Sequence, residues 1–225
     1  MKKKSFLAPA LLFLSFALWT VLVRIIDTDA IGPLNSTVGF AKLNGFVHGI
    51  IGENLALYRL TDILSVIPIF ICLCFAALGL SQAIGRKSLL KVDASLLLLG
   101  GFYISVMTVY VFFELVPINC RPVLIDGRLE VSYPSSTTVL FMTVIPAALI
   151  EVRRRVKSRG LFLLFAALGT SLTVFAVICR IMSGVHWISD IIGGALISLS
   201  LVLTYRALIK TPMKINTGAV LSEKL

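Results

Sequence analysis

The sequence predicts an all-α integral membrane protein: six transmembrane helices in a bundle, with a partly helical interfacial segment between the first two. Two observations predict this fold class, the composition and the presence of six long apolar runs. Hydrophobic residues make up 58% of the 225 residues and charged residues only 14%, and the mean hydropathy is +0.99. A soluble domain carries about 25% charged residues. The composition therefore excludes a soluble protein, and the dominant apolar runs exclude a disordered one.

Six segments have the length of about 20 apolar residues that crossing a bilayer requires. The first follows three lysines and is longer than the roughly 7–15 apolar residues of a signal-peptide core, so we interpret it as a retained anchor. The fourth is short and contains Pro146, which predicts a kink. We expect a single domain over residues 1–225, with spans at about 5–26, 63–84, 94–115, 136–152, 160–180 and 187–208. The interfacial segment is expected within the connection between Asp27 and Asp62.

The charges of the connections predict the orientation of the bundle. Fifteen of the 21 Lys and Arg residues lie on the side that carries both termini, and six lie on the other side. Connections rich in Lys and Arg stay in the cytoplasm, so both termini are expected there, in a bacterial plasma membrane. The formal net charge of +10 then reflects topology and anionic lipid headgroups. Nucleic-acid binding loses its main support, and no obligate protein partner is evident.

The connection between the fifth and sixth spans carries the sharpest pattern, CRIMSGVHWISD. His186 and Asp190 are four residues apart, so on a helix they share a face, and an ionisable residue inside a span suggests function. Asp190 could fix the tautomer of His186 and leave the other ring nitrogen as a nucleophile or base, while Arg180 could bind a phosphate. The alternative is structural: Asp190 neutralises Arg180, and His186 is a bystander. The spacing alone favours neither interpretation.

The connection between the third and fourth spans adds a second arginine, in Arg121-Pro122, and the turn YPSS at residues 133–136. A serine-rich turn before a helix presents free N–H groups to an anion. Ordinary N-capping by Ser135 or Ser136 would explain the same residues. Together, two arginines, a helix N-terminus and a His–Asp pair at one membrane depth predict a phosphate pocket.

These residues resemble the type 2 phosphatidic acid phosphatase superfamily of integral membrane phosphatases. That family has three motifs: Lys, six residues and Arg-Pro; then Pro-Ser-Gly-His; then Ser-Arg, five residues, His, three residues and Asp. The third is matched here by Cys179-Arg180, His186 and Asp190, with only the leading Ser changed. The first retains Arg121-Pro122, and residues 134–137 stand in place of the second. The order and the six spans also match, so the resemblance covers essentially the whole chain.

The resemblance implies a lipid-phosphate phosphatase whose active site lies on the outer face and needs no metal or cofactor. By the resemblance, His186 is the nucleophile that takes the phosphoryl group and Asp190 orients it. Arg121, Arg180 and groups at Ser135 and Ser136 would hold the phosphate oxygens.

Two positions depart from the family pattern. Glu114 stands where the first motif has Lys, and Thr137 stands where the second has the His that acts as general acid. Three explanations are open. The enzyme acts on a diphosphate, such as undecaprenyl diphosphate, whose leaving group needs little acid help; or a buried, neutral Glu114 donates the proton; or the chain binds lipid phosphates without turning them over.

Three further residues carry hypotheses. His48, the only other histidine, could fold over the site and supply the missing acid, although an exposed loop histidine is the simpler interpretation. Cys120 and Cys179 each precede one of the two arginines on the side where disulfides persist, so we hypothesise a disulfide between them. Two unpaired thiols packed at helix ends are the alternative.

Overall fold

The computed structural model describes residues 5–211. Lys2–Lys4, Lys214 and Lys224, which contribute to the predicted orientation, lie outside the described residues. Within residues 5–211 the chain forms eight α-helices and two short 3₁₀ turns. The helices are α1 (Leu7–Ile25), α2 (Ala41–Ile51), α3 (Leu55–Leu64), α4 (Val66–Gly85), α5 (Ala94–Leu115), α6 (Ser136–Arg155), α7 (Arg159–Met182) and α8 (Ile188–Lys210), and the turns are η2 (Pro33–Asn35) and η3 (Leu89–Lys91).

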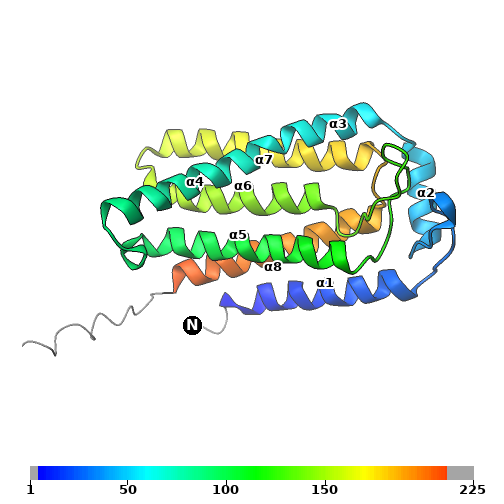
Figure 1. Ribbon diagram of the computed structural model, residues 1–225, viewed down its shortest axis with the longest axis horizontal. Helices are drawn as coiled ribbons and strands as arrows, with labels where there is room; N and C mark the ends of the chain where they lie inside the picture. The colour runs from blue at the N-terminus through cyan, green and yellow to red at the C-terminus, as the bar shows by residue number, and fades with distance from the viewer. Residues whose placement is uncertain (1–4, 212–225) are drawn as a thin grey trace, which may run out of the picture.

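The long helices run side by side along the long axis of the molecule, and α2 lies across one end of the bundle (Figure 1). Helix α6 packs against both α7 and α8, and α1 packs against α8. Six helical segments are long and apolar enough to cross a membrane, with α3 and α4 counted as one. The predicted fold class is therefore confirmed, including the partly helical segment between the first two spans.

The second span begins earlier than the sequence suggested. We expected it from Ile63, but the helical segment begins with α3 at Leu55 and continues through Ser65 into α4. The side chain of Asn54 caps the start of α3 by accepting a hydrogen bond from the N–H of Leu57 at 3.1 Å, as an N-cap residue does. Residues that we had assigned to the interfacial connection therefore belong to a helix that packs against α7.

Helix α6 contains Pro146, as expected, and ends at Arg155 rather than Val152, so it is three residues longer than expected. Its last turn contains Glu151, which is fully buried. That carboxylate accepts hydrogen bonds from Tyr205 at 2.9 Å and from Arg155 at 3.1 Å. Polar residues extend the helix here because each finds a partner inside the bundle.

The connection between α5 and α6 folds into a hairpin (residues 119–132). The N–H of Arg121 donates to the carbonyl of Glu130 at 2.9 Å, and the N–H of Ser132 donates to the carbonyl of Asn119 at 2.9 Å. Asp126 and Gly127 have positive φ angles of 47° and 74°, as a tight hairpin turn requires. This hairpin lies at the same end of the bundle as α2 (Figure 1).

The loop between α7 and α8 (residues 183–187) is also at this end, and it carries His186. The carbonyl of Ser183 accepts a hydrogen bond from the N–H of Asn54 at 2.9 Å, so the loop is joined to the start of α3. Gly184 follows with φ of 65°, and a Cβ atom added there would fall on the carbonyl oxygen of Gly52. Only glycine fits both constraints.

We predict that Gly184→Ala destabilises the protein by more than ~1 kcal/mol, because a side chain at this φ is strained and would push the loop away from Gly52. The measurement is the unfolding midpoint of the detergent-solubilised protein. Gly49→Ala is the matched control, because a Cβ at Gly49 meets no atom within 4 Å. Equal midpoints for the two variants would contradict the prediction.

Candidate active site

His186 and Asp190 face one another as their spacing predicted. The His186 Nδ1 atom lies 3.6 Å from Asp190 Oδ2, and the side chains are 1% and 0% exposed. His186 belongs to the loop after α7, and Asp190 lies in the first turn of α8. The pair is therefore held at the start of a helix and shielded from solvent. Its separation is longer than a hydrogen bond, and Nδ1 makes no hydrogen bond to another group of the described residues.

The other ring nitrogen of His186 identifies its protonation state. Arg121 Nη1 lies 3.1 Å from His186 Nε2. A guanidinium group has only donors, so Nε2 accepts this hydrogen bond and carries a lone pair. The proton of the neutral ring is then on Nδ1, facing Asp190. This tautomer is the one that leaves Nε2 available as a nucleophile.

The Asp190 carboxylate is fixed by other donors as well. The N–H of Trp187 donates to Oδ2 at 3.1 Å, and the amide of Asn119 donates to Oδ1 at 3.2 Å. The backbone carbonyl of Asp190 accepts the N–H of Ser135 at 3.1 Å. One residue therefore joins the start of α8, the hairpin and the start of α6.

Arg180 does not pair with Asp190, which removes the structural alternative for the His–Asp spacing. Its Nη1 atom donates to Thr61 Oγ1 at 2.9 Å and to Asp62 Oδ1 at 3.1 Å, both on α3. The residue is 2% exposed, and its Nε atom is buried without a hydrogen-bond partner. Arg180 is thus held from the α3 side and keeps one donor unused.

A cavity of about 790 Å³ joins these groups. Arg121, Arg180 and His186 line it, and so do three acidic residues, Asp62, Glu114 and Glu130. Glu130 forms a 2.9 Å ion pair with Arg121. Apolar side chains of α4, α5 and α6 line the rest of the cavity, namely Ile69, Val106, Met107, Val109, Phe113, Val139 and Leu140. The cavity therefore has a charged part and an apolar wall, as a site for an amphiphilic phosphate needs.

The environment of His186 favours its neutral form. Burial holds the pKa of His186 well below its usual value of 6.5, and the positive charges of Arg121 and Arg180 lower this pKa further. Both effects penalise the imidazolium. The ring is therefore neutral at neutral pH, as a nucleophile must be.

The serine-rich turn at the start of α6 faces the cavity only in part. Ser136 and Thr137 line the cavity, whereas Ser135 is not among its lining residues. Ser135 is fully buried and its Oγ accepts from the N–H of Thr138 at 3.4 Å, so it caps the helix. Of the two interpretations of this turn, N-capping describes Ser135, and the anion-facing role remains open for Ser136 and Thr137.

Both departures from the family pattern face the cavity, because Glu114 and Thr137 are lining residues. Thr137 is 6% exposed, whereas Glu114 is exposed. Glu114 makes no ion pair among the described residues. It therefore adds a carboxylate without an ion-pair partner to the lining of the cavity.

The structure does not place His48 over the main cavity, and it contains no disulfide between Cys120 and Cys179. His48 lies on α2, half-buried, with its ring 5.5 Å from that of Trp187. It borders a small space that His186 also lines, but it is not among the residues that line the main cavity. Cys120 and Cys179 are free, so the hypothesised disulfide is absent. Cys179 is instead packed within α7, which is the alternative we had kept.

Sequence reasoning missed a group of side chains that hold the two arginines and Asp190. Tyr58, Thr61 and Asp62 come from α3, and Asn119 and Glu130 come from the hairpin. The spacing of Tyr58, Thr61 and Asp62, at positions i, i+3 and i+4, places them on one helical face. That spacing was the available signal, and it escaped notice because the start of α3 was assigned to a connection.

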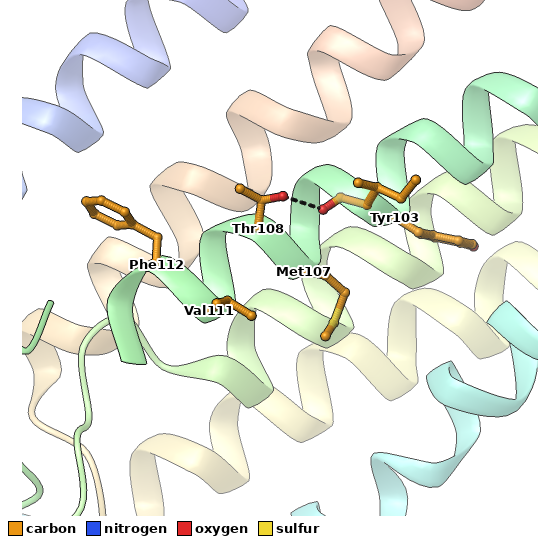
Figure 2. Close-up of a pocket in the computed structure, with 6 residues that line it drawn as sticks. Tyr103, Met107, Thr108, Val111 and Phe112 are labelled. Carbon is orange, nitrogen blue, oxygen red and sulfur yellow. Dashed lines mark hydrogen bonds between the residues drawn. The ribbon is translucent and has the colours of Figure 1, made fainter. Parts of the chain in front are cut away.

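A second depression lies on the outward face of α5 (Figure 2). All its lining residues come from that helix: Tyr103, Ile104, Met107, Thr108, Val111 and Phe112. The Thr108 hydroxyl donates to the carbonyl of Ile104 at 2.9 Å, so it is satisfied within the helix. None of the lining residues is charged, and the depression offers no group for phosphate chemistry.

The comparisons with known proteins agree with this site. Residues 112–214 match the PAP2 superfamily. This match covers every motif residue from Glu114 to Asp190 and agrees with the family resemblance over that part of the chain. One solved structure, a transmembrane PAP2-type phosphatidylglycerolphosphate phosphatase from Bacillus subtilis, superposes with a TM-score of 0.61. It is 17% identical, and the alignment covers 92% of this chain and 98% of the other. The fold is therefore that of a transmembrane PAP2 protein. No curated protein sequence matches the chain significantly.

We predict that the His186 ring stays neutral down to pH 6.5 and titrates only below it. The chain has two histidines, so histidine-selective ¹³C and ¹⁵N labelling gives two ring signals, and the signal lost in His48→Gln assigns the other. Arg121→Gln should raise the pKa of His186, because it removes a nearby positive charge. Arg128→Gln, on the same hairpin, is the matched control. A His186 titration midpoint at or above pH 6.5 in the unmodified protein would contradict the prediction.

Proposed function

We propose that this integral membrane protein is a metal-independent lipid-phosphate phosphatase that works through a phosphohistidine on His186. One observation carries the proposal: His186 Nε2 accepts a hydrogen bond from Arg121 at 3.1 Å while Nδ1 faces Asp190 at 3.6 Å. This is the protonation state and orientation of a nucleophilic imidazole. The match to the PAP2 superfamily supports the same chemistry.

In the first step, Nε2 attacks phosphorus, the N–P bond forms, and the bond from phosphorus to the leaving oxygen breaks. The imidazole ring gains positive charge, which the Asp190 carboxylate stabilises. Arg121 and Arg180 neutralise the charge on the non-bridging phosphate oxygens, and the N–H groups at Ser136 and Thr137 add dipoles. In the second step, water attacks phosphorus and the N–P bond breaks. Phosphate leaves with both protons of the water, and neutral His186, protonated on Nδ1, is restored.

The leaving group decides which substrate fits. Thr137 cannot act as a general acid near neutral pH, and such an acid typically contributes roughly 100- to 10,000-fold. A phosphate leaving group has a pKa near about 6 and needs little protonation, whereas an alcohol needs much more. We therefore propose a lipid diphosphate as the substrate, in the class of polyprenyl diphosphates such as undecaprenyl diphosphate. The apolar side of the cavity would accommodate the start of the lipid chain.

The site is proposed to face the outside of a bacterial plasma membrane. It lies at the end of the bundle with the hairpin and α2, whereas the connections α4–α5 and α6–α7 lie at the other end (Figure 1). Positive residues cluster at that end, among them Arg153, Arg154 and Arg155 in the last turn of α6. By the positive-inside rule, that end belongs in the cytoplasm, so the substrate and the surrounding lipids would be met on the outer leaflet.

The first test compares turnover of a lipid diphosphate and a lipid monophosphate by the purified protein. We expect the diphosphate to react roughly 100-fold faster or more, because it needs no general acid. His186→Ala should lower kcat/KM by about 1,000-fold or more, while His48→Ala, the matched histidine control, should change it less than about twofold. Equal rates for the two substrates would overturn the choice of diphosphate. Turnover unchanged by His186→Ala would overturn the phosphatase mechanism. Binding of both lipids with no turnover would instead indicate a lipid-phosphate-binding protein.

A second test addresses Glu114, the other residue that could donate a proton. If the leaving group needs no acid, Glu114→Gln keeps kcat for the diphosphate within about threefold. It should lower KM, because a negative charge near the phosphate is removed. A fall in kcat of about 100-fold would instead assign the acid role to Glu114. Glu53→Gln, outside the cavity lining, controls for a general charge effect.

A further inference from the structure

Both phosphate-facing arginines contact the same aromatic ring. The Cζ atom of Arg180 lies 4.7 Å from the centroid of the Tyr58 ring, and the Cζ atom of Arg121 lies 5.5 Å from it. Both distances are within the range of a cation–π interaction. Tyr58 also lines the cavity, so the ring lies beside the place where a phosphate would bind.

The two arginines are otherwise held from different sides. Arg121 is bound by Glu130 on the hairpin at 2.9 Å, and Arg180 by Asp62 on α3 at 3.1 Å. Two positive charges in one cavity repel each other, and the carboxylates bind them from separate elements. The negative face of one ring attracts both guanidinium groups. Among the contacts of the described residues, Tyr58 is thus the side chain that both arginines share.

The backbone around Tyr58 fixes where this ring lies. The carbonyl of Tyr58 accepts the hydroxyl of Thr61 at 2.7 Å, and the same hydroxyl oxygen accepts from Arg180 at 2.9 Å. Helix α3 begins after Asn54, whose N–H donates to the carbonyl of Ser183. The ring is therefore positioned relative to Arg180 and to the loop that carries His186.

We propose that Tyr58 is a positioning residue that holds Arg121 and Arg180 side by side at the spacing that one phosphoryl group requires. The inference rests on the proposed function for the identity of the ligand. The aromatic face carries the role rather than the hydroxyl. Without the ring, each arginine relaxes toward its own carboxylate, and the bidentate contacts that arginines make to phosphate no longer converge on one group.

The test measures binding of inorganic phosphate to the full-length protein in detergent. The change in the ring signal of His186 with phosphate concentration reports the binding. Tyr58→Phe should bind phosphate within about twofold of the unmodified protein, because it keeps the ring. Tyr58→Leu should weaken binding about tenfold. Tyr103→Leu is the matched control, since Tyr103 lines the separate depression on α5 and not this cavity, and it should change binding less than about twofold. Tyr58→Leu with unchanged phosphate affinity, or Tyr58→Phe as weak as Tyr58→Leu, would overturn the proposal.

A graded series keeps the test decisive if Tyr58→Leu does not fold. Replacing Tyr58 by phenylalanine with one, two or three ring fluorines preserves the shape and reduces the negative charge of the ring face. Phosphate affinity should fall step by step along the series, and a flat series would overturn the proposal. Because binding needs no turnover, the outcome is separate from that of the phosphatase assay: a protein that binds phosphate through the Tyr58 ring but hydrolyses no lipid would refute only the phosphatase.

Discussion

The buried carboxylate of Asp190 is the constraint on which the site depends. Its oxygen atoms accept from the backbone of Trp187 and the side chain of Asn119, and its own carbonyl binds Ser135. Three segments far apart in the sequence, the start of α8, the hairpin and the start of α6, therefore meet at one residue. A buried charge is tolerated only where donors surround it. The same donors hold Asp190 Oδ2 at 3.6 Å from His186 Nδ1, so the carboxylate faces the ring of the nucleophile.

The positive charges of the site are held in a different way. Each arginine has its own carboxylate, and these carboxylates line the cavity themselves. A phosphate entering the cavity must therefore compete with Glu130 for Arg121 and with Asp62 for Arg180. Glu130 is 42% exposed and Asp62 45% exposed, so both can regain water when they are displaced. Arg180 Nε is buried and unpaired, so it can donate without displacing a carboxylate.

The sequence predicted those parts of the protein that depend on local spacing. Hydropathy predicts the six spans because each span must satisfy its own backbone in lipid. The spacing of His186 and Asp190 predicts their contact because His186 lies just before the helix whose first turn carries Asp190. Glu130 could not be paired with Arg121 in this way, because their contact depends on the register of the hairpin. Tyr58 and Asp62 were missed because a polar helix end resembles a connection in hydropathy. The prediction of a Cys120–Cys179 disulfide was wrong. Two arginines can line one cavity while the residue before each of them faces a different neighbour.

The net charge of the cavity lining affects which leaving group can depart more than it affects the binding of a phosphate group. Glu114 and Thr137 both face the cavity, where the family pattern has two groups that carry or donate protons. With His186 neutral, the lining has two positive and three negative side chains, so it does not stabilise an alkoxide that forms when a phosphate monoester is cleaved. A departing phosphate already spreads its charge over several oxygens and can leave toward the exposed end of the cavity. The same two substitutions that weaken the case for a general phosphatase therefore favour a substrate whose leaving group is itself a phosphate.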